Sequence, residues 1–180
     1  MNKIILTVFA ATSLLLYSTP SFAISLSVGV PIGASIKSDD GSEMADGASG
    51  YFLGVQLPFG LGLGMDSHKT KYKDSSTLKV ATSMYNLYFQ LPVPVVSLIL
   101  GLGTGNSNYD CPDRGGGTCA EIFDKGAATQ WYTSIGFPII PFFDIHLSYR
   151  SITSKNIKDP DGSKYDVSGT ITGIGLAFNF

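Results

Sequence analysis

Residues 170–180 read TITGIGLAFNF, and their side chains fall into two alternating sets. In a β-strand, successive side chains point to opposite faces, so residues two apart share a face. One face carries Thr170, Thr172, Ile174, Leu176, Phe178 and Phe180, and the other carries Ile171, Gly173, Gly175, Ala177 and Asn179. This pattern predicts a strand with large apolar side chains toward lipid and mainly small side chains toward a crowded interior.

The same period of two recurs in seven further stretches. Their predicted lipid-facing sets are Leu26, Val28, Val30; Tyr51, Leu53, Val55, Leu57; Leu61, Leu63, Met65; Tyr85, Leu87, Phe89, Leu91; Val96, Leu98, Leu100, Leu102; Trp131, Thr133, Ile135, Phe137; and Phe143, Ile145, Leu147, Tyr149. A water-soluble β-sandwich also alternates, but it would place many glycines on its solvent face, where strands would lose packing. The interior of a small barrel needs small residues, so the pattern favours a barrel.

Charged residues mark the connections between these strands. After residue 23, only Asp144 and Arg150 lie outside four charged windows, which run from Lys37 to Asp46, Asp66 to Lys79, Asp110 to Lys125 and Lys155 to Asp166. A membrane-crossing strand needs roughly 9 to 11 residues. The first and last weakly charged stretches therefore hold one strand each, and the three inner stretches hold two each. We expect an all-β, transmembrane, eight-stranded, antiparallel, up-and-down β-barrel.

The two kinds of connection should lie at opposite ends of this barrel. Proline cannot donate to a strand ladder, so the prolines within the inner stretches predict short turns at Leu57 to Gly60, Leu91 to Pro94 and Phe137 to Pro141. The charged windows predict external loops at about residues 37–48, 66–79, 106–126 and 154–166. Short periplasmic turns that alternate with longer external loops are the layout of bacterial outer-membrane barrels.

The composition excludes other classes of protein. The chain has 180 residues, of which 14% are charged, and a net charge of −2, so we expect no binding of nucleic acid. The mean hydropathy is +0.20, yet no apolar run reaches the roughly 18 residues that a membrane-spanning helix needs.

Residues 1–23 predict a removable signal peptide, and residues 24–180 predict one barrel domain. Lys3 precedes an apolar segment from Ile4 to Leu16, and small residues lead to a cleavage point after Ala23. An N-terminal membrane anchor is the alternative, but this apolar segment is too short to span a membrane.

The two cysteines, Cys111 and Cys119, lie in the glycine-rich segment CPDRGGGTC. An exported chain reaches an oxidising compartment, so we expect a disulfide between them. A metal site is the alternative, but two thiols with no adjacent histidine make a weak one. We expect neither a metal ion nor a cofactor.

The signal peptide, the eight strand-length segments and the final stretch ending in phenylalanine resemble the small OmpA/OmpX-like class of outer-membrane β-barrels. In that class, alternating apolar residues before a C-terminal aromatic residue form the signal that the barrel-assembly machinery reads. The resemblance assigns this assembly signal to Ile174, Leu176, Phe178 and Phe180. It implies a protein of the Gram-negative outer membrane, in contact with lipid and lipopolysaccharide. We expect a monomer with a structural or surface-interaction role and an extracellular ligand or host surface as a candidate partner.

Two other functions stay open as alternatives. Eight strands leave room only for side chains, which excludes a wide pore but leaves a narrow channel for small solutes. His146-Leu147-Ser148 resembles the His-x-Ser of lipid A deacylases. The candidate third members of that site are Asp159, Asp161 and Asp166. Those enzymes act at the lipid-facing surface, whereas the period of two turns His146 and Ser148 inward, so we expect no enzyme.

Inward-facing charged and titratable residues instead predict an internal charge network that fills the barrel. Its expected members are Asp66, His68, Asp144, His146 and Arg150.

Overall fold

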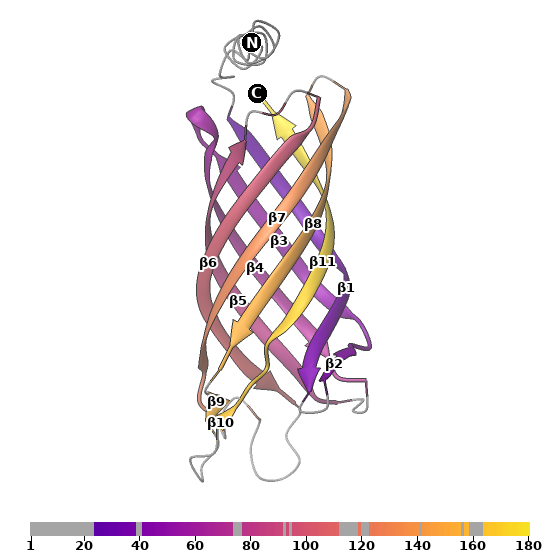
Figure 1. The fold of residues 1–180 in the computed structure, drawn as a ribbon, viewed down its shortest axis with the longest axis vertical. Coiled ribbons are helices and arrows are strands. Elements are labelled where there is room, and N and C mark those ends of the chain that lie inside the picture. Colours follow the sequence, from indigo (N-terminus) through magenta and orange to yellow (C-terminus); the bar gives the residue numbers. More distant parts are fainter. Residues whose placement is uncertain are drawn as a thin grey trace, which may run out of the picture.

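The computed structural model describes residues 24–38, 41–73, 77–91, 93, 95–111, 119, 123–140, 142–155, 157–158 and 164–180. The predicted signal peptide lies outside these described residues and stays a prediction. The described residues form a closed sheet with one small separate hairpin (Figure 1).

Eight long strands make up the closed sheet in the described part of the chain. They are β1 (Ser25–Ser38), β3 (Ala48–Gln56), β4 (Leu61–Lys71), β5 (Lys79–Leu91), β6 (Ser97–Asp110), β7 (Gly126–Ile140), β8 (Phe143–Ser154) and β11 (Gly169–Asn179). Each long strand pairs antiparallel with the next one along the chain. Because β11 also pairs antiparallel with β1, the sheet closes, and the expected up-and-down barrel is confirmed.

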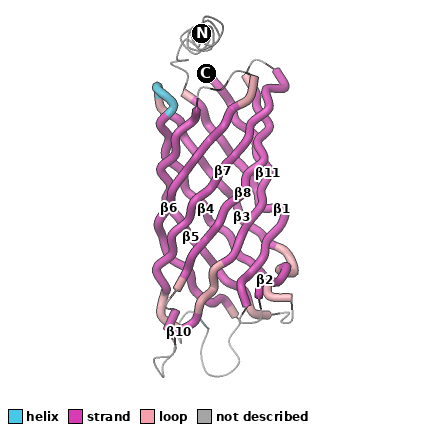
Figure 2. The backbone as a smooth tube through the Cα atoms, viewed as in Figure 1, coloured by secondary structure: helices cyan, strands magenta, loops and turns pink. Residues whose placement is uncertain are grey.

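The two ends of the barrel differ in their connections (Figure 2). The turn end carries Ile24, Phe180 and the short connections, the first of which contains the 3-10 helix η1 (Pro58–Gly60). The loop end carries the longer connections. These include the short strands β2 (Gly41–Met44), β9 (Ile157–Lys158) and β10 (Lys164–Tyr165). Strand β2 pairs with β1, and β9 pairs with β10.

The predicted turn at Phe137 to Pro141 is wrong in its extent. Strand β7 continues through Pro138 to Ile140 before the chain turns. The pairing of β7 with β8 is irregular between Pro138 and Ile140. Such a bulge lets a strand keep a residue that cannot donate a backbone hydrogen bond.

The predicted loop boundaries are also wrong where they follow charge alone. Residues 66–71 belong to β4 rather than to a loop, which leaves 72–78 as the connection to β5. At the next connection, β6 continues to Asp110. Charge marks contact with water, but a strand continues beyond the apolar layer for as long as its backbone stays paired.

The two faces of the barrel follow the predicted alternation. Outward side chains such as Tyr85 and Leu102 are 69% and 71% exposed, whereas the inward Met84 is completely buried. At the inward positions Gly62 and Gly101, an added Cβ would overlap the rings of Tyr88 and Tyr132, respectively. Glycine at these two positions therefore makes room for the aromatic rings inside the barrel.

The seam between the first and last strands completes the closed sheet. Its register pairs Ser25 with Asn179, and Phe180 N donates to Ile24 O at 2.9 Å. The Phe178 and Phe143 rings meet edge to face, with their centroids 4.5 Å apart. Three residues of the proposed assembly signal, Ile174, Leu176 and Phe178, thus lie on the strand that closes the barrel, and Phe180 directly follows it.

We expect Phe180→Ala to lower the fraction of folded protein in outer membranes, because it removes the terminal aromatic residue assigned to the assembly signal. The heat-modifiable band on gels measures this fraction. Phe142→Ala is the matched control, since Phe142 is also an exposed phenylalanine at the turn end. If both variants assemble equally well, the assignment of Phe180 is wrong.

Candidate functional site

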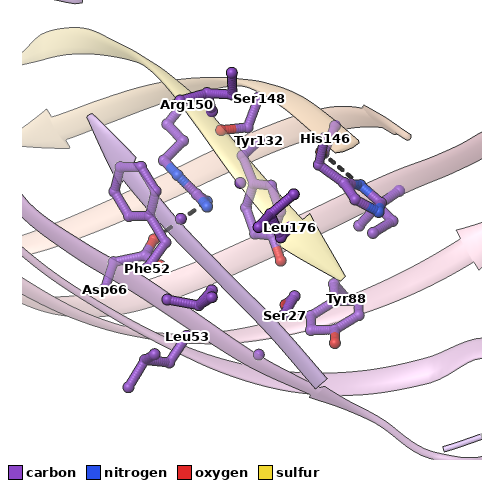
Figure 3. A pocket seen from close by; sticks show the side chains of 17 residues that line it. Ser27, Phe52, Leu53, Asp66, Tyr88, Tyr132, His146, Ser148, Arg150 and Leu176 are labelled. Atoms are coloured by element: carbon purple, nitrogen blue, oxygen red, sulfur yellow. Dashed lines mark hydrogen bonds and ion pairs between the residues drawn. The ribbon is translucent and has the colours of Figure 1, made fainter. Parts of the chain in front are cut away.

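The middle of the barrel interior is built around Arg150, which points inward from β8 (Figure 3). Its guanidinium carbon lies 3.9 Å from the centroid of the Phe52 ring and 4.4 Å from that of Tyr132. Arg150 Nη1 lies 3.2 Å from Asp66 Oδ2. Two aromatic rings and one carboxylate therefore hold the cation in a fixed place.

Two amide side chains extend this contact across the interior. Gln130 Nε2 lies 2.6 Å from Asp66 Oδ2 and 2.5 Å from Asn86 Oδ1, and it donates to both oxygens. Asp66 is consequently shared between Arg150 and Gln130. We call Arg150, Asp66, Gln130 and Asn86 the Arg150 cluster.

A second polar group, the Asp144 cluster, lies nearer the turn end. Gln90 Nε2 donates to Ser97 Oγ at 3.2 Å, and Ser97 Oγ donates to Asp144 Oδ2 at 3.0 Å. His146 Nε2 lies 3.8 Å from the same carboxylate oxygen, and His146 Nδ1 lies 3.3 Å from Ser134 Oγ. The cluster consists of Gln90, Ser97, Asp144, His146 and Ser134.

The structure places all five residues of the expected charge network inside the barrel, but in separate groups. Asp66 pairs with Arg150, and Asp144 lies beside His146. His68 packs edge-on against Phe52, with ring centroids 6.2 Å apart. The Nδ1 atom of His68 has no hydrogen-bond partner among the described residues. The period of two already predicts that Gln130 and Asn86 face inward. It does not predict that Gln130 donates hydrogen bonds to Asn86 and to Asp66.

A cavity of about 60 Å³ lies between the two clusters (Figure 3). Its lining includes Tyr88, Tyr132, His146, Ser148 and Arg150. Arg150 Nε and His146 Nε2 have no hydrogen-bond partner among the described residues. A space of this size and polarity suits a few water molecules rather than an organic substrate.

The described residues of the deacylase alternative are not brought together. His146 contacts Ser134 rather than Ser148. Asp166 lies beyond the loop end of β8, where Ser168 donates to it and Lys37 Nζ lies 3.9 Å away. Asp159 and Asp161 lie outside the described residues. Because His146 and Ser148 line the interior cavity, neither side chain reaches the lipid-facing surface.

An aromatic and aliphatic cap covers the interior at the loop end. Val80, Ile157 and Val167 form a buried cluster, against which Tyr72, Tyr109 and Phe123 pack. The Tyr109 and Phe123 rings meet edge to face at 5.1 Å, and Tyr165 lies 6.4 Å from both. We call these seven residues the loop-end cap.

The disulfide lies beside this cap. Cys111 and Cys119 are bonded, with their Cα atoms 5.3 Å apart. Phe123 N donates to Cys119 O at 2.9 Å, so a backbone hydrogen bond connects the disulfide to a residue of the cap. The expected disulfide is therefore formed in the structure.

Two ion pairs lie on the outside of the barrel at its loop end. Lys69 Nζ lies 2.6 Å from Asp110 Oδ2, and Lys71 Nζ lies 2.7 Å from Asp46 Oδ2. The hydrogen bond from Lys71 holds the pKa of Asp46 below its ordinary value, and the lysine charge adds to this effect. Both pairs are partly exposed, so each contributes little to stability.

The described residues contain no helix long and apolar enough to cross a membrane. They also contain no group of three histidine, cysteine, aspartate or glutamate side chains arranged to hold a metal ion.

Solved structures with a similar barrel identify the fold. Neisserial surface protein A, NspA, matches with a TM-score of 0.68 and 16% identity over 89% of this chain and 98% of that chain. The chain has the fold of a bacterial outer-membrane β-barrel. The expected resemblance to small outer-membrane barrels is thus confirmed for the fold.

Two further outer-membrane barrels match over similar lengths. The N-terminal β-barrel domain of Pseudomonas aeruginosa OprF has a TM-score of 0.53 and 12% identity, over 89% of this chain and 98% of that domain. Ail, the attachment invasion locus protein of Yersinia pestis, has a TM-score of 0.52 and 18% identity, over 89% of this chain and 99% of that chain. Neither a protein-family model nor a curated protein matches the sequence.

We expect Arg150→Leu to lower the free energy of unfolding by about 3–5 kcal/mol, because it leaves the Asp66 carboxylate buried without its cation. The double variant Arg150→Leu/Asp66→Leu should recover much of this loss, since no charge then stays unpaired. Denaturant unfolding of the refolded barrel in lipid vesicles measures both. Lys71→Ala, which breaks an exposed pair, serves as the control and should cost less than about 1 kcal/mol. Equal losses in the single and double variants would contradict this role for the pair.

We expect replacement of both cysteines by serine to leave the barrel folded, because the disulfide lies outside the strand ladder. The segment between β6 and β7 should become easier to cut with protease, since its two ends are no longer joined. Heat-modifiability and limited proteolysis measure the two effects. A cysteine-free chain that fails to form a heat-modifiable barrel would show that the disulfide is needed for folding.

Proposed function

We propose that this chain resides in the bacterial outer membrane and acts through its loop end, in a structural or surface-interaction role. The observation that carries the proposal is the filled interior. The Asp144 cluster, the Arg150 cluster and the loop-end cap follow one another along the barrel. The cavity between the two clusters has room for only a few water molecules. Such an interior favours a packed scaffold over a channel.

The outward surface supports residence in a membrane. Leu63, Tyr85, Leu87, Leu102 and Trp131 are each more than half exposed on neighbouring strands. A continuous apolar surface of this kind exceeds what soluble monomers usually expose. In an outer membrane the same side chains would contact the hydrocarbon chains of lipids.

The contrast between the barrel ends supports an external role for the loop end. Short turns lie at one end and longer polar connections at the other, which in outer-membrane barrels are the periplasmic and extracellular sides. The names of two similar barrels refer to a surface or to attachment: neisserial surface protein A and the attachment invasion locus protein. The second has also been solved in complex with the heparin analogue sucrose octasulfate. These names support surface interaction as the general role.

We expect the refolded chain to show a heat-modifiable band and no steady conductance in planar lipid bilayers, because its interior is filled. Tyr88→Ala/Tyr132→Ala is the matched control, since it removes two rings beside the cavity and should raise the conductance. A stable unit conductance of the parent protein would support a narrow channel instead. Protein recovered from the soluble periplasm, with no heat-modifiable band, would contradict the outer-membrane assignment.

The enzyme alternative needs a separate measurement. We expect lipid A from cells that produce the protein to have the same acylation as lipid A from cells that lack it. Mass spectrometry of lipid A decides this. If acylation changes with the parent but not with His146→Ala, a deacylase replaces the non-enzymatic role.

A further inference from the structure

The hairpin of β4 and β5 carries lysines on the outward face of the barrel. On β4, the row of outward side chains runs from Leu63 through Met65 and Ser67 to Lys69 and Lys71. The row therefore passes from the apolar surface to positive charge along a single strand. The side chain of Lys69 is 54% exposed and that of Lys71 is 35% exposed.

Strand β5 adds a third lysine beside them. Lys79 belongs to the outward set that continues through Ser83 to Tyr85. In the ladder, Lys79 lies directly opposite Lys71. Like charges in directly opposite positions destabilise a sheet, and on its other side Lys79 lies directly opposite Asp110 of β6.

Nearby carboxylates only partly neutralise this charge. Asp110 pairs with Lys69, and Asp46 pairs with Lys71. Three lysines thus share two described carboxylates. Pairs exposed to water are weak, so an anion that offers several oxygens can compete with each of them.

The height of the lysines suits the surface of a membrane. Lys69 follows Met65 by four residues and Lys71 by six, which corresponds to roughly 10 and 15 Å along the barrel axis at about 3.3 Å per residue and a tilt near 40°. Lys79 lies opposite Lys71 and so at a similar height. Headgroups extend about 5–8 Å beyond the hydrocarbon on each side, and a lysine side chain can bend back toward them. The outward residues Asn106 on β6 and Thr129 on β7 are uncharged. Another outward lysine, Lys37 on β1, is separated from the β4–β5 hairpin by strand β3, so the hairpin gathers three lysines in one sector.

We propose that Lys69, Lys71 and Lys79 form a binding site for the phosphate groups of an anionic lipid in the outer leaflet. The apolar side chains below, including Met65 and Tyr85, would contact the acyl chains of the same lipid. This inference rests on the proposed membrane location with the loop end outward.

Native mass spectrometry of the folded barrel in detergent, titrated with bisphosphorylated lipid A, tests the site. We expect Lys69→Gln/Lys71→Gln/Lys79→Gln to bind at least about tenfold more weakly than the parent, because each lysine near an anionic lipid contributes to affinity. The control replaces three lysines of other connections, Lys125, Lys155 and Lys164, by glutamine and should bind like the parent. If the triple variant does not fold, Lys79→Gln alone should still weaken binding, since neither described ion pair involves it.

A second variant predicts a change in the opposite direction. Asp46→Asn/Asp110→Asn removes the carboxylates that compete for Lys69 and Lys71, so lipid A should bind more tightly than it binds the parent. Lysines that served only to hold the strands together would not give this gain. Unchanged or weaker binding by this variant overturns the proposal.

Two probes separate the lipid from other ligands. Inorganic phosphate at the same phosphate concentration should not displace lipid A, and phosphatidylcholine should bind more weakly. Displacement by free phosphate, or equal binding of phosphatidylcholine, overturns the lipid-phosphate site. A barrel that folds into bilayers but binds lipid A equally well without the three lysines overturns this inference and leaves the proposed function intact. A chain that does not fold into bilayers overturns the proposed function itself.

Discussion

A strand that crosses lipid must satisfy every backbone N–H and C=O group within the protein, because no water is present to do so. In this chain the pairing of β1 with β11 meets that requirement, since it removes the two free edges of the sheet. Closure then fixes the other features. One face of every strand becomes the outer surface, and the other becomes the wall of a narrow interior.

The closed sheet explains why so much of the fold follows from the sequence. A period of two separates outside from inside along the long strands, as the large residues Ile174 and Leu176 and the small Gly175 between them show. In β1 the bulge between Pro31 and Gly33 reverses the alternation, so Ile32 is exposed and Ile36 is buried. Charge marks where the chain meets water, which locates the connections. Strand ends are less predictable, because pairing and not polarity ends a strand. Lys69 and Lys71 stay in β4 because β3 and β5 still pair with it, and Pro138 stays in β7 because a bulge accommodates it.

The contacts inside the barrel depend on information that no strand carries by itself. Sequence alternation turns Asp66 on β4 and Arg150 on β8 inward, but it does not say that they meet. That depends on the register of every intervening strand and on the tilt, which together set the height of each side chain along the axis. The same reasoning applies to Phe52 and Tyr132, whose rings lie beside Arg150 from two different strands. The residues of the interior were thus predictable, whereas their partners were not.

The interior and the loop end place different physical demands on the chain. Inside, a charge is stable only when a partner accompanies it, so Arg150 and Asp66 constrain each other and the side chains around them. At the loop end, water screens charges, and Lys69 and Lys71 can exchange partners at small cost. A site that must bind and release a ligand from outside needs the second environment. The packed interior holds the strands in register, and this register keeps Lys69, Lys71 and Lys79 together on the outward face, so the rigid part of the molecule positions the part that can interact.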